Sequence, residues 1–90
     1  MLVLCIHSAN PKRPGFPSKE EFIANREKNM KAMMEKKLPI KSLFSVSNED
    51  RSRMWCVWET DNVERIRAMM DAIPNTHTEI IQVWRVPQVM

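Results

Sequence analysis

Two amphipathic segments, each opened by a helix-capping signal, constrain the fold of this chain more than any other feature. Ser18 precedes Glu21 by three positions, and Asp61 precedes Glu64 by three. At this spacing, each side chain of the pair can bond a backbone amide that the first turn of a helix leaves free. Apolar residues recur at intervals of three and four after both signals, so the sequence predicts a helix after each.

Strand-like runs with a period of two lie before, between and after the two helices. A proline follows each helix, at Pro39 and at Pro74, and the residue before a proline avoids the helical region. The proline-rich stretch 10–17 is predicted to be a loop, which could cover the opening of a pocket. In chain order, the predicted elements are a strand at 1–8, a helix at 19–37, strands at 40–47 and 54–60, a helix at 62–73 and a strand at 78–86.

This order of elements is that of the ferredoxin-like α+β fold, βαββαβ, in which a four-stranded antiparallel sheet carries two helices on one face. The length of 90 residues predicts a single domain, 1–90. A chain this short buries only about 60–65% of its unfolded surface, so oligomerisation is a common source of further stability. The hydrophobic fraction of 43% is large enough for an apolar interface in addition to a core.

Charge and cysteine usage restrict the partners and the compartment. The net charge of +3 is weak, and the basic residues of the N-terminal half, among them Arg26, are predicted to form a solvated helix face, so no nucleic-acid partner is expected. No segment approaches the roughly 20 apolar residues of a membrane span, and the N-terminal run is too short for a signal peptide. Cys5 and Cys56 lie in apolar runs without zinc-site spacing, which predicts free buried thiols and a cytoplasmic location.

Two helices can cover only one face of the sheet, and the other face needs its own explanation. In the first strand, the uniformly apolar set Leu2, Leu4 and Ile6 is predicted to contact the helices, as is Trp55 in the third. The mixed sets are then assigned to the uncovered face, which is too apolar to remain in water. A second copy of the chain is expected to cover it and to enclose a cavity. The residues assigned to this face are Cys5, His7, Cys56, Trp58, Gln82 and Trp84.

The order of elements, the strand ending VWET (57–60) before a capped helix and the last strand IIQVWRV (80–86) resemble the dimeric α/β-barrel superfamily. Its members include antibiotic-biosynthesis-type monooxygenases, haem-degrading monooxygenases, muconolactone isomerase-like proteins and small uncharacterised relatives. The resemblance covers nearly the whole chain and rests on topology and on Trp58. It implies a homodimer whose sheets form a barrel, with a ligand pocket inside the barrel or between sheet and helices. The haem-degrading branch also has an asparagine on the first strand and a histidine on a helix, whereas Asn10 and His77 lie outside those elements.

A second, local resemblance is to a small nickel-binding family with a ferredoxin-like fold. That family has a histidine on the first strand, a cysteine in the third strand and a histidine before the last strand. His7, Cys56 and His77 occupy roughly these places. The resemblance implies a site for nickel or another transition metal.

His7 is the candidate catalytic residue, because an imidazole in a partly buried pocket can act as an acid or base near neutral pH. It could equally be a histidine held by hydrogen bonds at a dimer interface. The large flat indoles of Trp58 and Trp84 can stack against an aromatic ligand or pack across the dimer. The amide of Gln82 can orient the ligand, and the guanidinium of Arg85 can contact an anion at the rim of the pocket. The candidate ligand-binding residues are Trp58, Trp84, Gln82, Arg85 and Cys56.

The sequence therefore predicts a small homodimeric protein that binds an aromatic or polyketide-like molecule and requires no cofactor. Such a protein could act as a cofactor-independent monooxygenase, isomerase or cyclase. Two alternatives remain open at this point. The first is a nickel-type metal-binding protein without catalysis, and the second is a purely structural or regulatory dimer.

Overall fold

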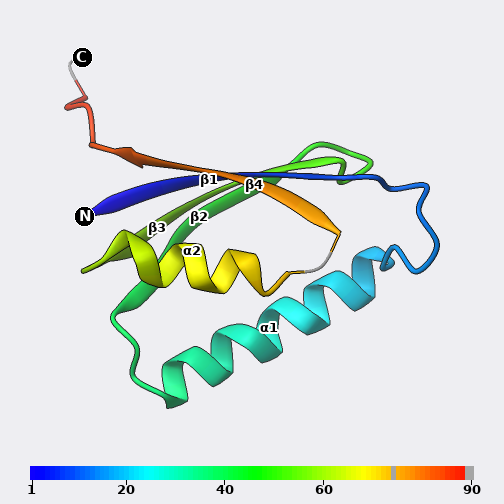
Figure 1. Ribbon diagram of the computed structural model, residues 1–90, viewed down its shortest axis with the longest axis horizontal. Coiled ribbons are helices and arrows are strands. Elements are labelled where there is room, and N and C mark those ends of the chain that lie inside the picture. Colours follow the sequence, from blue (N-terminus) through cyan, green and yellow to red (C-terminus); the bar gives the residue numbers. More distant parts are fainter. Residues whose placement is uncertain (74, 89–90) are drawn as a thin grey trace.

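The structure, a computed structural model, describes residues 1–73 and 75–88 and has the predicted order of elements. The four strands form one antiparallel sheet in the order β2-β3-β1-β4, and both helices lie on the same side of it (Figure 1). This α+β arrangement is compatible with a ferredoxin-like topology. The elements are β1 (Leu2–Ala9), α1 (Lys19–Glu35), β2 (Ile40–Ser47), β3 (Arg53–Thr60), α2 (Val63–Asp71) and β4 (Thr76–Val83).

The capping box predicted for α1 is confirmed. The Ser18 hydroxyl accepts a hydrogen bond from the backbone amide of Glu21 at 3.1 Å, and the Glu21 carboxylate accepts one from the amide of Ser18 at 3.4 Å. Neither described helix is both long enough and apolar enough to cross a membrane. Pro74, predicted to end α2, lies outside the described residues.

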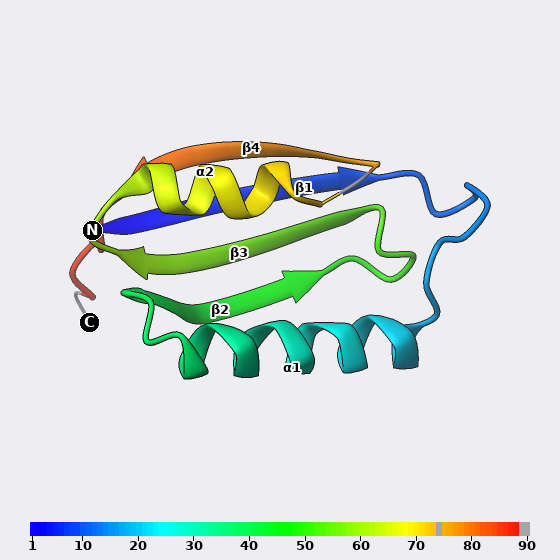
Figure 2. The ribbon, with the colours of Figure 1, turned by 60° about the horizontal axis from the view of Figure 1, so that its bottom comes forward.

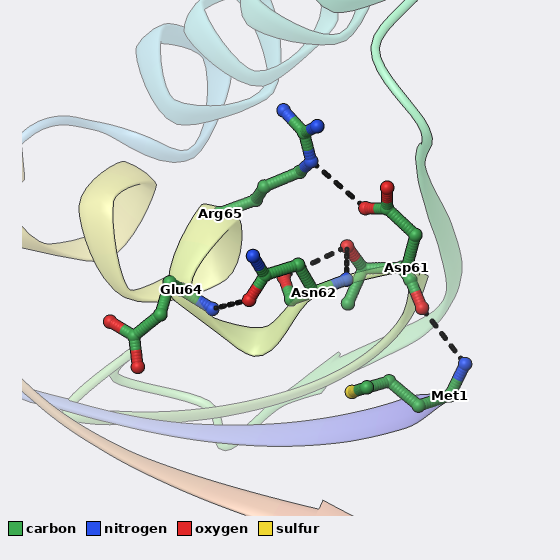
Figure 3. A network of polar contacts seen from close by, with 6 residues as sticks. Met1, Asp61, Asn62, Glu64 and Arg65 are labelled. Atoms are coloured by element: carbon green, nitrogen blue, oxygen red, sulfur yellow. Dashed lines mark hydrogen bonds and ion pairs between the residues drawn. The ribbon is translucent and has the colours of Figure 1, made fainter.

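The cap of α2 differs from the prediction by one residue (Figure 3). Asn62, not Asp61, has the extended backbone of an N-cap, and its side-chain oxygen accepts from the amide of Glu64 at 3.0 Å. Asp61 instead accepts from Arg65 Nε at 2.9 Å, one helical turn further on. An asparagine and an aspartate cap a helix about equally well, so the spacing alone could not choose between them.

The core lies between the sheet and α2. Ile66 and Met70 are the buried residues of α2, and they pack against the two central strands. The imidazole of His7 lies on the same side of β1 and is only 6% exposed. The strand side chains in this cluster are Val3, Cys5, Cys56 and Trp58.

The core reverses the predicted assignment of the two faces of the sheet. Side chains predicted for the uncovered face are covered by the helices instead: Cys5, His7, Cys56 and Trp58. The three β1 residues predicted to contact the helices alternate with these and project from the opposite face: Leu2, Leu4 and Ile6. The reason is that β1 is apolar at almost every position, so its hydrophobic pattern is compatible with either orientation.

The uncovered side of the sheet consequently has an apolar centre, with charged side chains toward its ends, among them Glu59 beside Leu2 and Glu79 beside Ile6. Across its middle, Phe44, Val57, Leu4 and Ile81 are neighbours on successive strands. Trp55, predicted as core, also lies on this side, because it pairs with Ile6. We call this surface the apolar face, and it comprises Leu2, Leu4, Ile6, Phe44, Val46, Trp55, Val57, Ile81 and Val83.

The edge strand β2 carries an irregularity. Ser42 pairs with Trp58 and Phe44 pairs with Val57, so the register shifts between these two pairs. Leu43 is the extra residue of this β-bulge. Such a bulge bends a strand and increases its twist.

Candidate functional site

Helix α1 contacts the sheet much less closely than α2 does. It runs alongside β2 at the edge of the sheet, while α2 lies over the region of β1 and β4 (Figure 2). None of the seventeen residues of α1, all of which the structure describes, is buried. Its inner side is only half-buried and is formed by Phe22, Arg26, Met30 and Met33.

A cavity of about 410 Å³, widely open to solvent, lies between the two helices and the start of β2. This volume is within the range of small-molecule sites, which are typically lined by apolar side chains with a few polar groups. Three of the lining residues also pack against the buried core, so the cavity adjoins it. The lining residues are Met33, Leu38, Ile40, Arg65, Ala68 and Met69.

Arg26 reaches from the inner side of α1 to β2. Its Nη2 atom donates to the hydroxyl of Ser45 at 2.7 Å and to that of Ser42 at 3.1 Å. The prediction that Arg26 belongs to a solvated helix face is therefore wrong. A signal was present in the sequence, since Arg26 lies four residues after Phe22 and four before Met30, within the apolar stripe.

His7 is held on the covered face by a hydrogen bond between Nδ1 and the Thr78 hydroxyl, 3.0 Å apart. Burial lowers the pKa of His7 below its ordinary value, and the positive charge of Arg26 lowers it further. The imidazole is therefore neutral at physiological pH. Its Nε2 atom has no hydrogen-bond partner among the residues that the structure describes.

Trp58 is 3% exposed and lies opposite Ser42 on the neighbouring strand. Its indole Nε1 is buried and finds no acceptor within residues 1–73 and 75–88. A buried donor without a partner costs about 1–3 kcal/mol, so such groups are rare in folded proteins. The indole N–H is therefore a hydrogen-bond donor that a ligand could use.

The two cysteines face each other across β1 and β3, and both are free and buried, as predicted. Burial raises the pKa of Cys5 to about 11, and the neighbouring Cys56 sulfur contributes to this rise. The thiolate is the nucleophilic form of cysteine. Cys5 is therefore a neutral thiol at physiological pH, and its side chain packs in the buried core.

Three other candidate residues are not brought into this site. Gln82 pairs with Val3 and shares the covered face, but it lies on the edge strand and is exposed. Trp84 is 73% exposed and Arg85 is also exposed, because β4 ends at Val83 and does not continue to them. Within one copy of the chain, the structure therefore does not bring Trp58 and Trp84 together as two walls of one pocket.

The predicted alternative metal site is not assembled either. His77 is exposed and alternates along β4 with Thr78, which bonds His7, so the two histidines project from opposite faces of the sheet. Within the described part of the chain, no three His, Cys, Asp or Glu side chains are grouped so that they could hold a metal ion.

The loop at 10–17 does not lie over the cavity. Arg51, in the β2–β3 connection, donates to the carbonyl of Pro17 and stacks over the Phe16 ring, with its guanidinium carbon 4.7 Å from the ring centroid. These contacts hold the loop at the N-terminal end of α1, whereas Met33 and Leu38 line the cavity at the other end (Figure 2).

The chain is thus a small α+β protein with an apolar cavity between two helices and a neutral, buried imidazole on the same side of the sheet. Comparison with family models, with curated proteins and with solved structures finds no match to it.

Proposed function

We propose that this protein is a homodimer that binds an aromatic or polyketide-like small molecule between α1 and α2. The observation that carries the proposal is the cavity of about 410 Å³, whose lining is apolar except for Arg65. Met33 and Met69 form part of its wall, and methionine side chains adapt easily to the shape of a ligand. Because α1 has no buried residue anchoring it, the helix can also shift to admit a molecule.

The proposal includes proton transfer to His7 from a ligand that extends from the cavity along the covered face. His7 does not line the cavity: it pairs with Met54, whereas Ile40 of the cavity wall pairs with Thr60, six residues further along β3. A general base must be unprotonated at the working pH, and burial keeps this imidazole neutral. When Nδ1 donates to Thr78, Nε2 is the basic nitrogen. Removal of a proton from a bound phenol or enol would serve a cofactor-independent monooxygenase, an isomerase or a cyclase equally well.

The homodimeric state is supported by the apolar face. Monomeric proteins rarely leave a large apolar patch in contact with water, and the middle row of this face is apolar on all four strands. Phe44 is 56% exposed, and Val46 and Ile81 are 45% and 42% exposed. Two copies packed sheet against sheet would bury all of these side chains, as the two layers of a β-sandwich do.

Binding of the neutral naphthalene dye prodan, followed by its fluorescence, tests the small-molecule site. We expect saturable binding to the native protein with a blue-shifted emission. Ala68→Trp should weaken the binding roughly tenfold or more, because Ala68 is exposed on α2 and lines the cavity, so an indole there fills the space. Ala32→Trp is the matched control, since Ala32 is exposed on α1 and does not line the cavity.

Two results would contradict the proposal. The first is the absence of saturable prodan binding to a natively folded sample. The second is equal weakening by both tryptophan variants, which would place the dye elsewhere on the helices. Circular dichroism of each variant confirms that its fold is retained.

A further inference from the structure

We infer that the ligand of this site is an aromatic acid bound as its anion, with the apolar body in the cavity and the acidic oxygen held by Arg26. This inference rests on the proposed function and adds the chemical class of the ligand. The acidic group is a carboxylate, a planar group whose negatively charged oxygens match the donors of a guanidinium.

The first support is that the charge of Arg26 is not compensated. Arg26 is half-buried, and its two hydrogen bonds go to neutral serine hydroxyls. Both ion pairs found among the described residues involve other arginines, and Figure 3 shows one of them, between Arg65 and Asp61. Arg65, although it lines the cavity, therefore already has an anionic partner. A partly buried cation without an anionic partner is available to a ligand that supplies the opposite charge.

The second support is that the hydrogen-bonding capacity of Arg26 is only partly used. Both serine bonds come from Nη2, so Nη1 and Nε have no partner in the described part of the chain. Hydrogen bonds from a guanidinium to a negatively charged oxygen are about twice as strong as those between neutral groups. These two nitrogens can therefore bind an anionic oxygen while the serines keep the guanidinium in place.

The third support is the unpaired indole N–H of Trp58 on the neighbouring strand. Trp58 lies directly opposite Ser42, one of the two serines that hold Arg26. Ile40, which lines the cavity, lies two residues before Ser42 on the same side of β2. Neither Arg26 nor Trp58 lines the cavity, so a ligand that uses these donors must extend from the cavity past Ile40 toward Ser42, as a molecule with one apolar and one acidic end can do.

His7 is consistent with this arrangement. The charge of Arg26 helps to lower the pKa of His7, so the imidazole remains neutral. A neutral imidazole does not compete with Arg26 for an anion. The alternative role of Arg26 is purely structural, in which it holds α1 against β2 through the serines. The two roles differ in whether the affinity for a ligand depends on the charge of that ligand.

The test compares naphthoate with naphthamide, its neutral counterpart of nearly the same shape, by titration calorimetry at fixed pH and salt. We expect the native protein to bind naphthoate roughly 10- to 100-fold more tightly, as charge-assisted hydrogen bonds predict. Arg26→Gln should abolish this preference and leave the affinity for naphthamide unchanged. Lys28→Gln, which removes one positive charge from an exposed position of the same helix, should preserve the preference.

Each outcome is decisive. Equal affinity of the native protein for the two compounds would overturn the inference and leave the proposed function intact. Failure of both compounds to bind would overturn both. Loss of the preference in Lys28→Gln would show that the general charge of α1, not Arg26, is responsible. If Arg26→Gln does not fold, Arg26→Lys takes its place: it keeps the charge but donates from a single nitrogen, so the preference should fall, and a preference at the native value would overturn the assignment to Arg26.

Discussion

At the scale of single residues, the covered side of the sheet contains polar groups where a small protein normally places hydrocarbon. His7 is almost fully buried, Trp58 has an unpaired donor, and Arg26 takes a position in the apolar stripe of its helix. Each of these has a free-energy cost in the folded state. Groups of this kind are concentrated at functional sites, where their reactivity or binding compensates for the cost.

The lowered pKa of His7 predicts a dependence of stability on pH. As the pH falls, the unfolded chain takes up a proton on this imidazole before the folded chain does. Stability should therefore be complete above about pH 7 and decrease as the pH falls below the ordinary histidine pKa of about 6.5, by at most about 1.4 kcal/mol per pH unit. His7→Gln should remove this part of the decrease in urea titrations. His77→Gln, at an exposed position, should retain the native slope. A native slope in His7→Gln would show that the folded chain protonates this residue normally.

Part of the site was predictable from sequence. His7, Cys56 and Trp58 were assigned to one face of the sheet, and they do share a face. They were predicted on the uncovered face and lie on the covered one, because alternation shows which residues share a face but not which face the helices cover. Arg26 was missed because basic residues surround it in sequence, although its spacing from Phe22 and Met30 placed it in the apolar stripe.

At the scale of elements, the sequence predicted all six in the correct order, because each had its own pattern and its own end signals. The largest difference in a boundary is at the end of β4, predicted at 86 and found at Val83. What the patterns could not show is how closely each helix packs. Helix α2 buries Ile66 and Met70, whereas α1 buries none of its described residues and depends more on its own capping and internal hydrogen bonds.

This difference predicts that α1 opens locally more often than the rest of the fold. Amides of α1 should exchange with solvent much faster than those of β1 and β3. Ser18→Ala removes the acceptor that caps Glu21 and should speed exchange in α1 by a further roughly fivefold, since a cap contributes about 1 kcal/mol. Exchange in β1 and β3 should not change. Nuclear magnetic resonance exchange rates provide the measurement.

The matched control is Ser47→Ala, because the Ser47 hydroxyl bonds only the carbonyl of Asn48 within the hairpin between β2 and β3. It should leave exchange in α1 at the native rate. Protection of α1 equal to that of β1 in the native protein would show that the helix is held as firmly as the core.

At the scale of the whole molecule, the two sides of the sheet differ in what covers them. One side has two helices, and the other has the nine side chains of the apolar face, contributed by all four strands. Burial of apolar surface contributes about 25 cal/mol per Å². A second copy on the apolar face would supply stability that a chain of 90 residues gains only in part from its own core.

The proposed homodimer is tested by sedimentation velocity at micromolar concentrations. The native chain of 10.6 kDa should sediment as a dimer. Phe44→Glu should give a folded monomer, because it places a charge in the middle row of the apolar face. Ile23→Glu is the matched control, since Ile23 is 54% exposed on α1 and Phe44 is 56% exposed. A monomeric native chain, or a dimer that survives Phe44→Glu, would contradict the proposed assembly.

The bulge at Leu43 bears on how far such an assembly can grow. Regular edge strands are templates to which further chains can add indefinitely by backbone hydrogen bonds, as in fibrils. Because β2 has a bulge near its centre, its free edge is a poor template for the addition of another strand. Self-association at the β2 border is therefore disfavoured, and in the proposed dimer contact through the broad sides of the sheets would end with two copies instead of a growing ribbon.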